Sequence, residues 1–162
     1  MKEIYKMKQK TKKEIVSIKN YQKLAMRTCM KSCRNKEYAD FGFLSEQHEF
    51  LAKVYGYKAK QIRGDKDLSY DSIWQEIGDC FWFIALKCQL ATTSFEKLYK
   101  AKKPYENLKL KREEYSIIED INSTKGYCKM YKVRPLKCMQ LNIDKLASRK
   151  ARGKITGNGD DR

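Results

Sequence analysis

Apolar residues recur at steps of three and four along most of this chain, which is the spacing of amphipathic helices. Serine or aspartate precedes several of these runs, at Ser17, at Ser69, Asp71 or Ser72, and at Ser94, and such residues commonly cap helix N-termini. The pattern predicts four helices in the first two thirds of the chain. They cover about residues 17–28, 38–57, 69–90 and 94–103.

The third of these helices is apolar around much of its circumference. Ile73, Ile77, Phe81 and Ile84 follow one another at helical spacing, and further apolar residues fill the positions between them in its second half. A helix with so little polar surface is typical of the centre of a bundle. We therefore expect the other helices to pack around it.

The second half of the chain has a weaker pattern. Residues 105–135 are rich in tyrosine and lysine, and Gly126 and Pro135 interrupt them, so one helix over about 106–119 followed by a loop is expected. Helical spacing returns from about Leu136 to Arg152. With little strand-like alternation and no internal repeat, the sequence predicts an all-α bundle of four to five helices.

Composition sets the limits of this bundle. The 162 residues suffice for one domain, expected over 17–152 between a lysine-rich N-terminal arm, 1–16, and a glycine-containing flexible C-terminal tail, 153–162. The formal net charge is +16, which favours contact with nucleic acid, nucleotides or another polyanion. Residues 40–90, however, contain eight acids and six bases, a net charge of −2, so the remainder carries +18.

Cysteine and histidine contents exclude several metal sites. The chain has six cysteines without a CxxC pair and a single histidine, so a zinc site is not expected. Reduced, partly buried thiols in a cytoplasmic protein are the expected state. The longest apolar run, Cys80–Leu86, is far shorter than the roughly 20 residues that span a bilayer, so no membrane association is expected.

The acids of the central region include two pairs spaced three residues apart. Glu46 and Glu49 lie on the second predicted helix, and Glu76 and Asp79 on the third. Residues three apart share a helix face, so each pair presents two carboxylates in one direction. If the two helices pack side by side, four carboxylates converge, and such an all-oxygen site suits Mg²⁺, or Mn²⁺ in its place.

These acids stand in segments that resemble a known family. The second helix contains ExxE (Glu46 to Glu49) and the third contains E-x-G-D-x-x-W (Glu76 to Trp82), an arrangement similar to that of the MazG-like all-α nucleoside triphosphate pyrophosphohydrolases of bacteria and phages. YQKLAMRT (21–28) and NIDKLASRKARG (142–153) are similar to the flanking blocks of that family. The terminal GNGDDR (157–162) resembles a tail found in some of its members. The likeness covers roughly residues 18–100 and 138–162.

The resemblance implies an activity and its ligands. It implies Mg²⁺-dependent hydrolysis of a nucleoside or deoxynucleoside triphosphate to monophosphate and pyrophosphate, by a homo-oligomer, dimer or tetramer, whose chains complete each other's pockets. The metal ligands would be Glu46, Glu49, Glu76 and Asp79, and Glu49 is also the candidate general base. Residues 105–135 would be an insertion relative to the shorter family pattern.

Candidate substrate contacts surround these acids. Lys53 lies one turn beyond Glu49, and the basic and polar residues of the last helix recur at steps of three and four. The resemblance implies that an asparagine and a lysine of that helix approach the nucleotide and that an aromatic residue lies near its base or sugar. The candidates are Lys53, Trp82, Phe83, Asn142, Lys145 and Arg149. The tail 153–162 is a candidate lid.

Three other interpretations are weighed. A di-iron bundle would require Glu-x-x-His on two helices, but His48 points away from the face of Glu46 and Glu49 and the third helix has no histidine. A nucleic-acid-binding module is supported by the charge of +16 but has no use for clustered acids. A catalytically silent relative would bind Mg²⁺ and nucleotide without turnover. No residue pattern selects a base, a sugar or a cellular role.

Overall fold

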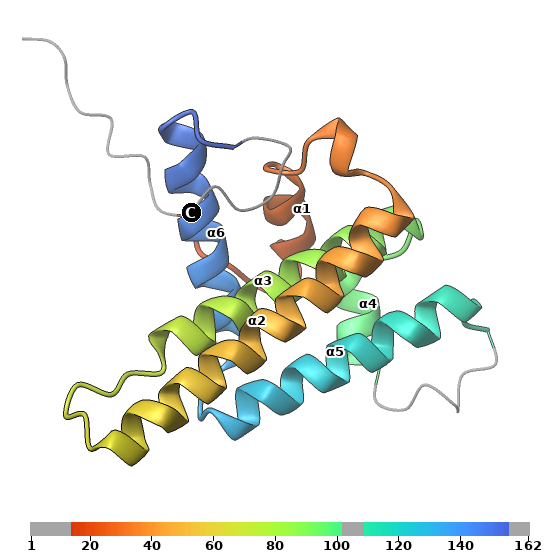
Figure 1. Ribbon diagram of the computed structural model, residues 1–162. Helices are drawn as coiled ribbons and strands as arrows, with labels where there is room; N and C mark the ends of the chain where they lie inside the picture. Colours follow the sequence, from red (N-terminus) through yellow and green to blue (C-terminus); the bar gives the residue numbers. More distant parts are fainter. Residues whose placement is uncertain (1–13, 102–108, 156–162) are drawn as a thin grey trace, which may run out of the picture.

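The computed structural model describes residues 14–101 and 109–155, and within them the chain is all-helical, without a strand (Figure 1). Six α-helices and one 3₁₀ turn account for its regular structure. Their bounds are α1 Tyr21–Met26, η1 Lys31–Cys33, α2 Lys36–Arg63, α3 Asp71–Leu90, α4 Phe95–Lys100, α5 Arg112–Met130 and α6 Pro135–Ala151. The all-α prediction is confirmed, with more helices than the four to five expected.

Helix α3 is the centre of the fold, as its apolar circumference predicted. It packs against α1, α2, α5 and α6, and its side chains at Ile73, Ile77, Phe81 and Ile84 have no exposed surface. Its bounds also match the expected 69–90 closely. Helix α3 also touches α4, and a helix in contact with all five others must be apolar on nearly every side, which is why its pattern was the clearest in the sequence.

Helix α2 runs antiparallel beside α3 and is longer than predicted (Figure 1). It begins after Asn35, whose side chain accepts a hydrogen bond from the backbone N–H of Tyr38, and it ends at Gly64 in the left-handed conformation with φ 82°. The sequence pattern indicated a stop near Tyr57, because no apolar residue follows there on the buried face. The last turns of α2 project beyond the core and are solvated.

The second half of the chain differs from the prediction. Helix α5 covers Arg112–Met130, and Gly126 lies inside it instead of ending it. Pro135 is the first residue of α6, where its missing N–H costs nothing. Ile117, Ile118 and Ile121 are buried against the rest of the bundle, so much of the predicted insertion 105–135 is an integral part of the core. Burial of this apolar face stabilises a helix that continues well beyond the end predicted near residue 119.

The N-terminal region also departs from expectation in detail. Helix α1 begins at Tyr21 and not at Ser17, whose hydroxyl instead accepts from the backbone N–H of Asn20 at 3.3 Å. Val16, assigned to the loose arm, is buried, and its N–H donates to Gln140 of α6 at 2.8 Å. Residues 1–13 of the arm, most of the candidate lid and Pro104 lie outside the described residues.

All six cysteines are buried thiols that form no disulfide. Their burial agrees with the sequence prediction. Among the helices that the structure describes, none combines the length and the apolar character that a membrane span requires.

Glu114 fastens the start of α5 to the preceding helix. One carboxylate oxygen accepts from the backbone N–H of Lys111 at 3.0 Å, and the other accepts from Thr93 Oγ1 at 2.6 Å and Lys97 Nζ at 2.9 Å. The bonds from Lys97 and Thr93 lower the pKa of Glu114 to about 2. This carboxylate therefore stabilises the folded protein in its ionised form.

We expect Glu114→Gln to destabilise the protein at pH 7 by about 1–2 kcal/mol, a value limited by solvent screening because Lys97 is 54% exposed. The native pKa lies below that of the unfolded chain, so the stabilisation is complete above about pH 4.5 and is lost as the pH falls through about 2. Denaturant titrations at pH 7 and pH 3 measure it. Glu113→Gln, an exposed neighbour on the same turn, is the control. Equal effects of the two substitutions at pH 7 would contradict the role of Glu114.

Candidate metal and nucleotide site

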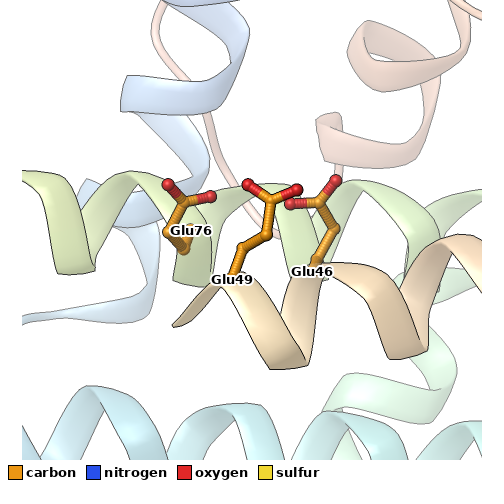
Figure 2. Close-up of side chains that lie close together, drawn as sticks. All are labelled: Glu46, Glu49 and Glu76. Atoms are coloured by element: carbon orange, nitrogen blue, oxygen red, sulfur yellow. The ribbon is translucent and has the colours of Figure 1, made fainter. Parts of the chain in front are cut away.

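Three glutamates from two helices meet on one side of the bundle. Glu46 and Glu49 project from α2, and Glu76 projects toward them from α3 (Figure 2). One carboxylate oxygen from each lies within 4.8 Å of those of the other two. We refer to these residues as the glutamate cluster. The packing of α2 against α3 thus brings together three of the four acids that the sequence singled out.

Burial and like charge distinguish the glutamate cluster. Glu46 Oε2 is buried and has no hydrogen-bond partner within the described ranges. Burial, together with the neighbouring charges of Asp79, Glu49 and Glu76, raises the pKa of Glu46 to about 8. Burial and the charges of Asp79 and Glu49 also raise the pKa of Glu76, which is only 9% exposed. A buried acceptor among carboxylates calls for a proton or a cation.

The fourth predicted ligand, Asp79, is engaged elsewhere. Its carboxylate accepts a hydrogen bond from Asn142 Nδ2 at 2.6 Å and forms an ion pair with Lys145, both on α6. Asp79 is close enough to influence the pKa of Glu46 and Glu76, but it is not part of the glutamate cluster. Two of the three α6 residues predicted as substrate contacts, Asn142 and Lys145, therefore bind Asp79 directly.

The contact between α3 and α6 depends on a glycine that the sequence analysis passed over. A Cβ added to Gly78 would lie 2.4 Å from the backbone oxygen of Cys138 and 3.1 Å from Cβ of Asn142. Only a residue without a side chain allows this approach, which holds Asn142 and Lys145 against Asp79. A glycine within a strongly helical apolar segment was the available signal, because such a residue costs helix stability and usually has a packing reason.

Lys53 lies at the other end of the glutamate cluster. Its ammonium is 3.7 Å from Glu76 Oε1, so it partly compensates the charge of that carboxylate. Lys53 was predicted as a substrate contact, and in this structure it pairs with an acid of the glutamate cluster. Neither Lys53 nor Glu76 lines the adjoining pocket.

A pocket of about 310 Å³ opens beside the glutamate cluster, with walls from the segment 28–33, from α2, α3 and α6, and from the residues that follow α6. One wall is acidic, and the basic side chains of Lys145, Arg149 and Lys154 contribute to another. The remainder is largely apolar and aromatic. The lining residues are Thr28, Met30, Cys33, Tyr38, Gly42, Ser45, Glu46, Glu49, Asp79, Trp82, Phe83, Asn142, Lys145, Leu146, Arg149, Lys154 and Ile155.

The two predicted aromatic residues border this pocket and are largely buried. Trp82 Nε1 donates to the backbone oxygen of Ala25 at 3.1 Å, which ties α3 to α1. Phe83 packs against Tyr38, with ring centroids 5.6 Å apart. Its ring also occupies the space that a side chain at Gly42 would fill. Sequence reasoning missed Tyr38 and Gly42, although Gly42 precedes Glu46 by one helical turn and so shares its face.

Comparison with known proteins identifies no relative of this chain. No protein-family model matches the chain, and neither a curated protein nor a solved structure matches it significantly. The function is therefore argued from the geometry and chemistry of this site.

Proposed function

We propose that this protein hydrolyses nucleoside or deoxynucleoside triphosphates to the monophosphate and pyrophosphate, in the manner of the MazG-like enzymes its motifs resemble. The observation that carries the proposal is the orphaned, buried Oε2 of Glu46 within three converging glutamates, next to a pocket with basic and aromatic walls. A metal–triphosphate complex requires carboxylates to hold the metal and, beside them, cationic side chains to bind the phosphate oxygens.

The residues present fit a hard divalent cation. All donors of the glutamate cluster are carboxylate oxygens, no thiol or imidazole belongs to it, and Glu46 Oε2 has spare acceptor capacity. Glu46, Glu49 and Glu76 would hold Mg²⁺, or Mn²⁺ in its place. Asp79 would join them as a fourth ligand if its ion pair with Lys145 opened. The bound cation would neutralise phosphate charge and acidify a coordinated water.

The remaining residues act on the substrate and the water. Glu49 both belongs to the glutamate cluster and faces the pocket, so it is placed to accept the proton of the attacking water. Lys145, Arg149 and Lys154 line the same pocket and would bind phosphate oxygens. Asn142 orients Asp79 through its amide.

The apolar part of the pocket would accommodate the nucleoside. Trp82, Phe83 and Tyr38 provide aromatic surface on which a base or sugar can pack. None of these side chains offers a hydrogen-bond pattern that selects one base. We therefore expect modest discrimination between bases.

The test is pyrophosphate release from a panel of canonical and modified ribo- and deoxyribonucleoside triphosphates with Mg²⁺. We expect release that Glu49→Gln and Asp79→Asn each reduce at least about 1,000-fold, since both remove charge at the reacting phosphate. Glu37→Gln, the same change on an exposed position of α2, is the control and should retain activity.

Absence of release from every triphosphate, with folding intact, would reject hydrolysis. The net charge of +16 would then favour a nucleic-acid-binding module. Such a module would show DNA or RNA affinity that falls steeply with salt and does not require the glutamate cluster.

A further inference from the structure

The first turns of α2 and α5 meet the end of α3 at one side of the bundle (Figure 1), and a second cavity lies between them. Its volume is about 650 Å³, about twice that of the pocket beside the glutamate cluster and within the ~300–1,000 Å³ of small-molecule sites. None of the described residues lines both spaces, and only the second has a wall from α5. We call it the α5 cavity. The proposed hydrolysis makes no use of it.

Cations outnumber acids in the wall of the α5 cavity. Its charged residues are Arg34, Lys36, Asp40, Lys87, Lys111 and Glu113, four bases and two acids, so their net charge is +2. The dipoles of α2 and α5 add to this positive potential, because the first turn of each helix lines the cavity. The electrostatic character of the α5 cavity therefore favours an anion.

Two of the four bases are already neutralised by the protein. Lys36 Nζ lies 2.9 Å from Asp40 Oδ2. Lys87 Nζ lies 3.1 Å from the other oxygen of Asp40 and 3.0 Å from Asp120 Oδ2. The side chain of Lys87 is only 13% exposed, and its ammonium lies 4.7 Å from the ring centroid of Phe43. This network fixes one wall of the cavity in place before any ligand binds.

The other two bases, Arg34 and Lys111, are available to a ligand. Within the described part of the chain neither forms an ion pair, and both side chains are exposed. Arg34 holds the backbone oxygen of Cys29 at 3.4 Å through one guanidinium nitrogen, which leaves its other N–H groups free to donate. The remaining acid, Glu113, is exposed, so solvent screens its charge. The uncompensated charge of the cavity therefore resides on Arg34 and Lys111.

An apolar surface completes the wall of the α5 cavity. Ala39 of α2 and Ile117 of α5 are buried, and Leu90 and Ala91 at the end of α3 are half-buried. Apolar walls with a few placed charges are typical of sites for small organic molecules. The ligand is therefore expected to carry an organic part beside its anionic group.

We propose that the α5 cavity binds a small phosphate monoester, with its phosphate on Arg34 and Lys111 and its organic part on the apolar wall. A phosphate monoester carries about −1.5 to −2 charges at pH 7, which matches the surplus of +2. A guanidinium pairs with two phosphate oxygens at once, and an ammonium adds a point charge. A polynucleotide would require an extended cationic track, so a small molecule is favoured over it.

Titration of the ¹⁵N-labelled full chain with phenyl phosphate, followed by amide chemical shifts, tests this site. We expect the amides of Ala39, Ala91 and Ser116 to shift with one Kd below about 1 mM. Phenol at the same concentrations should leave them unchanged, because it lacks the phosphate. Inorganic phosphate should bind at least about 10-fold more weakly, because it has no organic part to pack on the apolar wall. Unchanged amides with phenyl phosphate, or equal affinity for inorganic phosphate, would overturn the proposal.

Matched substitutions separate the α5 cavity from other cationic surfaces. The double variant Arg34→Gln, Lys111→Gln should weaken binding of phenyl phosphate at least about 10-fold, since it removes both charged donors. The control Lys19→Gln, Lys23→Gln loses the same charge at two exposed positions outside the cavity and should bind like the wild type. Circular dichroism checks that each variant retains its helicity. Equal affinities of the two double variants would show that net charge, and not this cavity, binds the phosphate.

The pocket beside the glutamate cluster provides a further control. Lys145→Gln removes a cation of that pocket and should leave the shifts at Ala39, Ala91 and Ser116 unchanged. No metal ion is needed for the titration, so binding in the α5 cavity is measured whether or not the protein hydrolyses triphosphates. Loss of these shifts in Lys145→Gln would mean that the phosphate binds in the other pocket and would reject the α5 cavity as its site.

Discussion

Glu46→Gln is expected to raise the melting temperature of the metal-free protein by about 2–8 °C and to abolish its stabilisation by Mg²⁺. The substitution replaces an orphaned, buried carboxylate oxygen with an amide that can donate to the neighbouring glutamates. Relief of an unsatisfied buried acceptor is worth about 1–2 kcal/mol. In a chain of this size each 1 kcal/mol shifts the melting temperature by about 2–4 °C.

The wild type should respond to metal in the opposite way. A cation held by the glutamate cluster binds only the folded state, and at 100 times its Kd it adds about 2.7 kcal/mol. Thermal unfolding with EDTA and with millimolar Mg²⁺ or Mn²⁺ measures both effects. The variant should be the more stable protein without metal and the less stable one with it.

Glu37→Gln provides the matched control for this reversal in the order of stability. It makes the same change on the same helix at an exposed position, where loss of a helix-dipole interaction costs only a few tenths of a kcal/mol. The contrary result is a wild type whose melting temperature does not change with either metal, while Glu46→Gln remains the more stable protein. It would mean that the glutamate cluster binds a proton and not a cation.

Gly78→Ala is expected to destabilise the protein by about 3 kcal/mol and to disturb the site at the same time. The new methyl group would approach the Cys138 carbonyl to 2.4 Å, and a backbone atom inside a helix contact cannot rotate away. Helices α3 and α6 must separate. Asn142 and Lys145 would then withdraw from Asp79.

Denaturant unfolding and pyrophosphate release, measured together, test this substitution. Gly126→Ala is the control because its Cβ would meet nothing within 4 Å on α5, so it should stabilise the protein by about 0.5–1 kcal/mol through helix propensity. The two glycine-to-alanine substitutions are therefore expected to change the free energy of unfolding in opposite directions. A neutral Gly78→Ala would show that α3 and α6 can pack without this close approach.

The features that depend on neighbouring positions in the chain were predictable. The central position of α3 followed from the apolar spacing of Ile73, Ile77, Phe81 and Ile84, all of which are fully buried. The shared face of Glu46 and Glu49 followed from the helical period, and so did their meeting with Glu76 once α2 and α3 were placed side by side. Helix limits were less predictable, because the end of α2 and the course of α5 depend on solvation and packing.

The sequence by itself thus determined the helical class, the central helix and the two acid pairs, since all of these arise from periodicity along one helix. Only the tertiary structure decided that Asp79 binds Asn142 and Lys145 and does not join the glutamate cluster, because these contacts join helices more than sixty residues apart. It also decided which apolar residues of α2 are core and which are exposed. Periodicity shows which apolar residues share a helix face, but only the positions of the neighbouring helices determine whether that face is buried.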